Sequence, residues 1–130
     1  MLDTNIIIHA QDDLNSVLKK FAENADSLFT STLCLVELHR GLVSEPRATA
    51  LRRARLDLLL SQIAILPFDV AAADAYAGII AERGFVRSRD FDRMIAAHAL
   101  SVNAVLVTDN EVDFADIPGL ALENWTAGQA

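Results

Sequence analysis

The amino-acid sequence predicts an α/β fold in which helices cover a mostly parallel sheet. Short apolar stretches rich in branched residues alternate with longer stretches of helical periodicity, an alternation typical of parallel sheets. No apolar stretch reaches the roughly 18 residues that a membrane helix needs, so no contact with a membrane is expected. The 130 residues suit one domain spanning 1–130, and only 6% of them are aromatic, so the core is expected to be mainly aliphatic.

Four to five strands are expected, and the first of them is strongly β-branched. Leu2 to Ile8 contains three consecutive isoleucines, which favour extended backbone. Ala104 to Thr108 is apolar throughout, so this strand is expected near the centre of the sheet. The shorter predicted strands are Ser27–Ser31, Ile63–Pro67 and an edge strand at Leu120–Glu123.

Helical periodicity predicts the elements between the strands. Gly41 and Gly84 are expected to end two of these helices, because glycine is favoured just beyond a helix C-terminus. A third helix is expected to turn Leu51, Leu58 and Leu59 toward the core. The predicted helices are Asp13–Ala22, Thr32–Leu42, Arg47–Gln62, Val70–Arg83, Phe91–Val102 and a turn at Glu111–Phe114.

Charge and cysteine content limit the classes of function. The net charge of −7 disfavours long-range attraction of a nucleic acid. Two arginine-rich stretches, within 47–55 and 83–93, could still face a phosphate backbone, and a bound metal ion would invert the local charge. The single cysteine, Cys34, excludes an internal disulfide, and the chain start lacks the pattern of a signal peptide. A cytoplasmic protein is therefore expected.

Three acidic residues stand where a structural role explains them poorly. Asp3 lies in the first apolar strand, where carboxylates are rare and an unpaired buried one is costly, unless a terminal turn exposes it. Glu37 lies beside the apolar face of its helix, although a surface pair with Arg40 is an alternative explanation. Asp92 begins an Ala-rich helix, where an acid also interacts well with the helix dipole.

These three acids together predict a metal site. Each lies at a junction of helix and sheet, and ligands of open parallel sheets bind beyond the carboxyl ends of the strands. Asp3, Glu37 and Asp92 could not all stay ionised at one such edge without a cation. Hard oxygen ligands favour Mg²⁺ or Mn²⁺ over zinc. Zinc is disfavoured because Cys34 is alone and the three histidines lack ligand spacing.

Four stretches of the chain, taken in order, carry a family resemblance. They are Met1-Leu-Asp-Thr-Asn-Ile-Ile-Ile8, Val36-Glu37-Leu38 with Gly41, Asp92-Arg-Met-Ile-Ala-Ala-His-Ala99, and Leu106-Val-Thr-Asp-Asn110 with Phe114, Pro118-Gly-Leu120 and Glu123-Asn-Trp125. Together they resemble the PIN-domain proteins, in particular the VapC toxins of bacterial toxin–antitoxin pairs. No single stretch is specific, whereas four in order, covering nearly the whole chain, are a strong match.

The resemblance implies a three-layer PIN fold with a twisted, mostly parallel sheet of four to five strands. It also implies the toxin of a type II toxin–antitoxin system, an Mg²⁺-dependent endoribonuclease that leaves a 5′-phosphate, with tRNA the preferred substrate. Such a toxin inhibits translation unless a cognate VapB-type antitoxin neutralises it. A homodimer of toxin chains, and a larger heteromeric complex with the antitoxin, are implied as well.

The resemblance also assigns roles to the site residues. Asp3 and Asp92 correspond to the principal metal ligands, and Glu37 to a further acidic ligand, direct or through water. The fourth catalytic position, where the family often has an acid, is Asn110, whose side-chain oxygen can still bind metal or orient a water.

Other residues near the fourth position and the third acid complete the expected site. Asp109 and Asp113 are less certain metal ligands that could replace the missing acid. One of Arg87, Arg89 and Arg93 is expected to steady the phosphate group of the RNA.

Two other functions fit part of the pattern. A phosphate-accepting receiver domain has a similar size and fold, but it needs paired acids after the first strand and a lysine after the last core strand. Here Thr4 and Asn5 follow Asp3, and the only lysines are Lys19 and Lys20. The other alternative is a catalytically inactive PIN module that only binds a partner. The three retained acids argue against it, while the asparagine in the fourth position leaves room for it.

Overall fold

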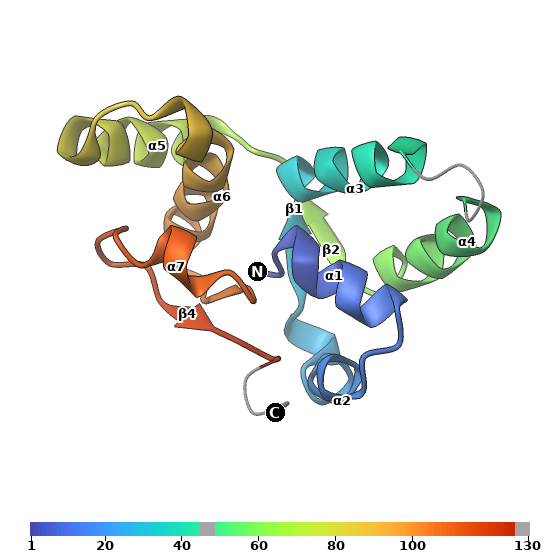
Figure 1. The fold of residues 1–130 in the computed structure, drawn as a ribbon. Helices are drawn as coiled ribbons and strands as arrows, with labels where there is room; N and C mark the ends of the chain where they lie inside the picture. The colour runs from blue at the N-terminus through green and yellow to red at the C-terminus, as the bar shows by residue number, and fades with distance from the viewer. Residues whose placement is uncertain (45–48, 127–130) are drawn as a thin grey trace.

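The structure is a computed structural model that describes residues 1–44 and 49–126. Helices and short strands follow one another along the chain, and apart from α1 they come in the order that the sequence predicts (Figure 1). The helices are α1 (Thr4–Gln11), α2 (Asn15–Glu23), α3 (Thr32–Ser44), α4 (Thr49–Leu60), α5 (Val70–Arg83), α6 (Asp90–Ser101) and α7 (Glu111–Phe114). The strands are β1 (Phe29–Ser31), β2 (Ala64–Leu66), β3 (Leu106–Val107) and β4 (Leu122–Glu123).

A parallel sheet runs through the middle of the molecule. β1 pairs with β2 and β3 pairs with β4, both in parallel. Leu2 joins the two pairs, because it forms parallel bridges to Thr30 on β1 and to Val107 on β3. The order across the sheet is therefore β2, β1, Leu2, β3, β4. This arrangement confirms the predicted mostly parallel sheet, with the strand at 104–108 near its centre.

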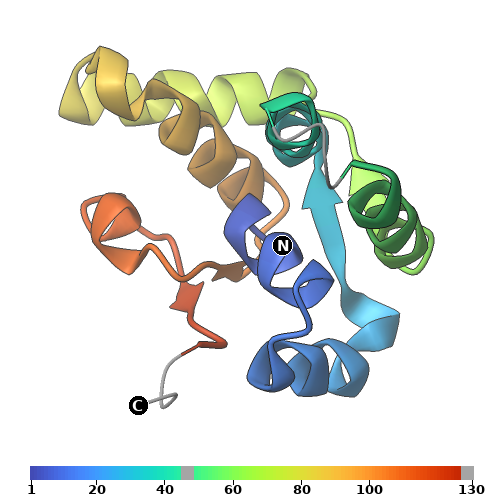
Figure 2. The same ribbon diagram turned by 45° about the vertical axis from the view of Figure 1, so that its right-hand side comes forward.

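Helices cover both faces of this sheet, so the fold has three layers. Helices α1 to α4 lie on one side and α5 to α7 on the other (Figures 1 and 2). Successive residues of a strand point to opposite faces. Leu2 and Val107 accordingly belong to the core beneath α1 to α4, while Met1 and Leu106 belong to the core beneath α5 to α7. The predicted α/β class and its layering are confirmed.

The predicted first strand, Leu2–Ile8, is wrong beyond its beginning. Only Leu2 pairs with the sheet, and helix α1 starts at Thr4. Asp3 has extended backbone and caps α1, since its carboxylate accepts the Thr4 amide. Ile6, Ile7 and Ala10 are all buried, at a spacing that suits a helix. Burial of this face therefore outweighs the β preference of the isoleucines.

Two glycines predicted to end helices behave differently. Gly84 ends α5 as expected, with φ +75°. Gly41 does not end its helix, because α3 continues to Ser44.

Two side chains of α4 also depart from the prediction. Leu51 and Leu58 are 61% and 63% exposed, and Leu56 fills the core in their place. The first residues of the predicted helix at 47–62 lie outside the described residues.

Candidate metal centre

Asp3 lies between Leu2, which joins the two strand pairs, and the start of α1. Hydrogen bonds fix both of its carboxylate oxygens. Oδ1 accepts the Thr4 amide at 2.8 Å, and Oδ2 accepts the Thr108 hydroxyl at 2.8 Å and the Asn5 side-chain amide at 3.1 Å. The side chain is buried, with 4% exposure, so the alternative of an exposed terminal turn is excluded. Neutral donors hold this carboxylate without neutralising its charge.

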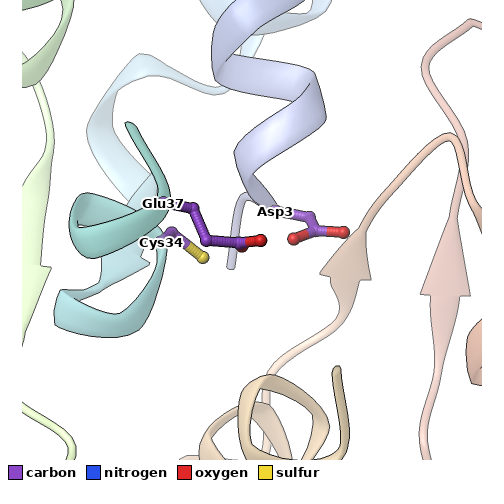
Figure 3. Close-up of side chains that lie close together, drawn as sticks. All are labelled: Asp3, Cys34 and Glu37. Atoms are coloured by element: carbon purple, nitrogen blue, oxygen red, sulfur yellow. The ribbon is translucent and has the colours of Figure 1, made fainter. Parts of the chain in front are cut away.

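Glu37 reaches the same place from α3. The Thr4 hydroxyl donates to its Oε1 at 2.7 Å, which links the carboxylate to the first turn of α1. A carboxylate oxygen of Asp3, one of Glu37 and the Cys34 sulfur lie within 4.8 Å of one another. Figure 3 shows the Glu37 carboxylate pointing toward Asp3, with Cys34 beside it. The two carboxylates are close enough to share one ion.

Asp92 completes the pocket from the opposite helical layer. It lies in the first turn of α6 and lines a pocket of about 220 Å³ that Asp3 and Glu37 also line. Asp92 is not part of the tighter group within 4.8 Å, so it faces the same space from farther away. The remaining lining residues are Thr4, Asn5, Ile8 and Asn110.

Asn110 enters this pocket through a network centred on Thr108. The Thr108 hydroxyl accepts the Asn110 backbone amide at 3.0 Å while it donates to Asp3. The Asn110 side-chain nitrogen donates to Asp113 at 2.6 Å, so its side-chain oxygen is the atom that can accept or coordinate. Asp109 and Asp113 do not line the pocket with it.

Asp109 is instead held at the outer end of α1. Its carboxylate contacts His9 Nε2 at 2.5 Å, and its backbone amide donates to the Asn5 side-chain oxygen at 3.1 Å. Asn5 and His9 are four residues apart and therefore lie on one face of α1. This face holds the 108–110 segment against the helix, which positions Asn110 at the pocket.

The electrostatics of the pocket favour a cation. Burial raises the pKa of the Asp3 carboxyl, although the hydrogen bond from Thr108 opposes this shift. Burial, followed by the negative charges of Asp3 and Asp113, raises the pKa of Asp92 to about 6. Like charges that repel one another in a shared pocket are stabilised by a divalent ion, and the carboxylate donor set fits Mg²⁺ or Mn²⁺.

Cys34 is a site residue whose position the sequence did not reveal. Its side chain is fully buried and lies against Asp3 and Glu37. Its spacing of three residues from Glu37 on the same helix was the available signal. Burial raises the pKa of the thiol to about 11, and the charge of Asp3 adds to the effect, so the sulfur stays protonated. A neutral thiol is a poor ligand for a hard cation.

The arginines expected to bind phosphate are not equivalent. Arg93 is buried, donates to the Gly84 carbonyl and lies 3.6 Å from Asp116, so it holds the protein together. Arg89 is 3.9 Å from the same carboxylate, whereas Arg87 is exposed. Arg93 is therefore engaged within the protein, which leaves Arg87 and Arg89 as the candidates for the predicted phosphate contact.

Arg40 does not form the surface ion pair with Glu37 that the sequence allowed as an alternative. Its guanidinium lies over the Phe91 ring, 5.4 Å from the centroid.

Comparison with known proteins identifies the family. The sequence matches the PIN domain over residues 1–120. This chain belongs to the PIN-domain family. It is 34% identical to Ribonuclease VapC2 of Rickettsia felis, with 96% of each chain covered. It is also 34% identical to a tRNA(fMet)-specific endonuclease VapC of Shigella flexneri, with 97% of each chain covered.

A solved structure agrees with this PIN-domain assignment. The VapBC complex of Salmonella typhimurium bound to DNA is similar with a TM-score of 0.85 and 32% identity, covering 96% of both chains. In the described part of this PIN domain, no helix has the length and apolar character to cross a membrane.

Proposed function

We propose that this chain is the ribonuclease toxin of a VapBC-type toxin–antitoxin pair, which cleaves RNA with a divalent metal, Mg²⁺ in preference. One observation carries the proposal. Asp3, Glu37, Asp92 and Asn110 line one pocket in a chain that is 34% identical to a tRNA(fMet)-specific endonuclease over nearly its whole length. The receiver-domain alternative lacks comparable support, because Thr4 and Asn5 serve here as donors to Glu37 and Asp3.

Each side chain has a definite part in this proposal. Asp3, Glu37 and Asp92 would hold the ion, while Thr108 and Asn5 fix the orientation of Asp3. A divalent ion bound there supplies positive charge that lowers the pKa of a bound water and stabilises charge at the phosphate. The side-chain oxygen of Asn110 orients a water or contacts the ion. Cleavage leaves a 5′-phosphate on one product and a 3′-hydroxyl on the other.

We propose tRNA as the preferred substrate. Residues 1–130 act on it as one PIN domain, in the cytoplasm. The names of the Shigella flexneri and Salmonella typhimurium relatives, both tRNA(fMet)-specific endonucleases, support this choice. Loss of initiator tRNA would stop translation, the outcome expected of such a toxin.

A VapB-type antitoxin is the proposed partner, together with a second copy of the chain. Support comes from solved relatives described as VapBC complexes. The surface of α3 also offers an apolar hollow that includes Val36 and Val43, which are 45% and 81% exposed. An unpartnered apolar surface of this kind is typical of a protein interface.

The proposal is tested by incubating the purified chain with initiator tRNA, elongator tRNAs and ribosomal RNA, with Mg²⁺ and with chelator. We expect cleavage of tRNA that needs the metal, and 5′-end mapping gives the position of the cut. Expression of the chain alone should arrest bacterial growth, and co-expression of the antitoxin should relieve the arrest.

Two variants make the test specific. Asp3→Ala should abolish both cleavage and growth arrest, while Asp74→Ala, which removes an exposed acid on α5, should change neither. Metal-dependent cleavage by the Asp3→Ala protein would sink the assignment. Growth without arrest, with a folded protein that cuts no RNA, would favour the inactive binding module.

A further inference from the structure

The segment between α5 and α6 is the most exposed basic part of the described chain. Residues 83–89 are all exposed and contain three arginines and no acidic residue, although the whole chain has a net charge of −7. Figure 2 shows this segment, in gold, at the outer end of the two helices. Its charge is therefore opposite to that of the molecule that carries it.

An aromatic ring stands in the middle of this basic segment. Phe85 is 64% exposed, and Arg83 and Arg87 flank it at two residues on either side. Neither arginine has an ion-pair partner among residues 1–44 and 49–126. Burying Phe85 against this protein would have been favourable. An exposed ring between unpaired guanidinium groups instead suits a partner that has flat rings and negative charge.

The segment is fixed relative to the acidic pocket. Arg93, one residue after Asp92, donates to the Gly84 carbonyl immediately before Phe85. The Tyr76 hydroxyl of α5 donates to Asp90 in the first turn of α6. The first contact joins Gly84 to the turn of α6 that presents Asp92 to the pocket, and the second joins α5 to the same turn. An RNA strand that extends from the pocket past the first turn of α6 can therefore reach the Phe85 segment.

We propose that Phe85, Arg83 and Arg87 form a platform for single-stranded RNA, on which an unpaired base next to the cleaved phosphate stacks on the ring while the arginines contact flanking phosphates. This inference rests on the proposed ribonuclease function and adds to it a subsite, outside the metal pocket, that holds an unpaired base of the substrate. Bases within a duplex are stacked on each other and cannot lie on a side chain. Base stacking on aromatic side chains depends little on sequence.

Binding measured without cleavage tests the platform. The wild-type chain in chelator is titrated against a labelled single-stranded RNA and against the same strand paired with its complement. Phe85→Ala should weaken single-strand binding about tenfold and leave duplex binding unchanged. Phe85→Tyr should retain binding and Phe85→Leu should not. Arg87→Ala should weaken both RNAs and reduce the salt dependence of log K by about one charge.

Matched variants on α4 and α2 serve as controls. Leu58→Ala removes a side chain of nearly the same exposure as Phe85, and Lys19→Ala removes an exposed cation outside both arginine-rich stretches. Neither should change RNA binding. In cleavage assays with metal, Phe85→Ala should raise KM and leave kcat unaltered, because the ring acts only on binding.

Several outcomes overturn the platform. These are wild-type affinity in Phe85→Ala, no binding of either RNA by the wild-type chain, or a Phe85→Ala effect limited to oligomeric state or antitoxin binding. The last result would make the segment a protein contact. The proposed function fails separately: a wild-type chain that cuts no RNA, yet binds single strands through Phe85, refutes the nuclease and retains the platform.

Discussion

At the scale of single residues, Asp3 combines two duties that conflict. Its hydrogen bonds cap α1 and connect it to Thr108, yet its charge is buried beside Glu37. Burial raises its pKa, which means that the ionised form destabilises the metal-free fold. Proteins commonly accept such a cost at a functional site.

The variant Asp3→Asn separates these duties. It keeps a side-chain oxygen for the cap and removes the charge. Mutation of residues that only hydrogen-bond to a metal ligand typically lowers activity about 10–100-fold. Because Asp3 is proposed as a ligand itself, we expect the rate of cleavage to fall more than about a hundredfold. The melting temperature without metal should change little, because removal of the buried charge offsets the loss of the hydrogen bonds from Thr108 and Asn5 to Oδ2. Cleavage assays and thermal unfolding in chelator measure both effects. An active Asp3→Asn protein would contradict the role of Asp3 as a ligand.

Asp92 gives a dependence on pH. Its pKa of about 6 in the folded chain exceeds the 3.8 of an ordinary aspartate, so the folded state binds this proton more tightly than the unfolded state. Without metal, stability should therefore increase as the pH falls from above 6 toward 4. The variant Asp92→Asn should lack this part of the profile. Thermal unfolding of both proteins in chelator, between pH 4 and pH 8, checks the expectation.

Cys34 tests which donors matter in the pocket. Its protonated sulfur should contribute little to a hard cation, so Cys34→Ala should keep Mg²⁺-dependent cleavage within about threefold of wild type. The lost sulfur leaves a small buried cavity, and the melting temperature should fall slightly. Loss of metal binding, measured by calorimetry, would instead make the thiol a ligand.

At the scale of elements, Gly84 determines how α5 passes into the basic segment. Its φ of +75° and ψ of 168° lie in a region that only glycine adopts readily. Gly84→Ala should therefore lower the free energy of unfolding by about 1–3 kcal/mol. Gly78→Ala, in the middle of α5 with nothing within 4 Å of an added Cβ, should raise it by up to about 1 kcal/mol. Urea denaturation of the two variants gives the comparison.

The sequence predicted elements well where local chemistry decided them. Gly84 marked the end of α5 correctly because its backbone conformation requires glycine, and the Ala-rich pattern located α6. Leu2–Ile8 was predicted as a strand because isoleucine prefers one, but packing of Ile6 and Ile7 between layers decides otherwise. Leu51 and Leu58 were expected inside because they fit a helical periodicity. Periodicity alone does not tell which apolar face of a helix is covered.

The site was predictable in part. Each acid alone had an ordinary explanation. Their shared position at junctions of helix and sheet, supported by the order of the motifs, brought Asp3, Glu37 and Asp92 together. The contact of Cys34 with these acids, and the hold of His9 on Asp109, depend on how α3 and α1 pack against the sheet. Such packing has no local signature in the sequence.

At the scale of the whole molecule, the pocket lies between the two helical layers. Asp3 and Glu37 come from the side of α1 and α3, and Asp92 from the side of α6. An ion that binds all three should therefore stabilise the whole fold. Mn²⁺ at about 100 times its dissociation constant should add about 2.7 kcal/mol to the free energy of unfolding. Asp3→Asn should lose this gain, and a gain of equal size in that variant would place the ion elsewhere.

The position of Leu2 in the middle of the sheet has a consequence for the synthesis of the protein on the ribosome. Leu2 and Asp3 contact Val107 and Thr108, which lie 105 residues away along the chain. A chain still emerging from the ribosome holds Asp3 and Glu37 long before it holds Thr108 and Asn110. We therefore expect the nascent protein to be harmless to the ribosome that makes it. The complete site forms only when the C-terminal part of the chain has been made, so the antitoxin needs to bind the toxin only at the end of its synthesis.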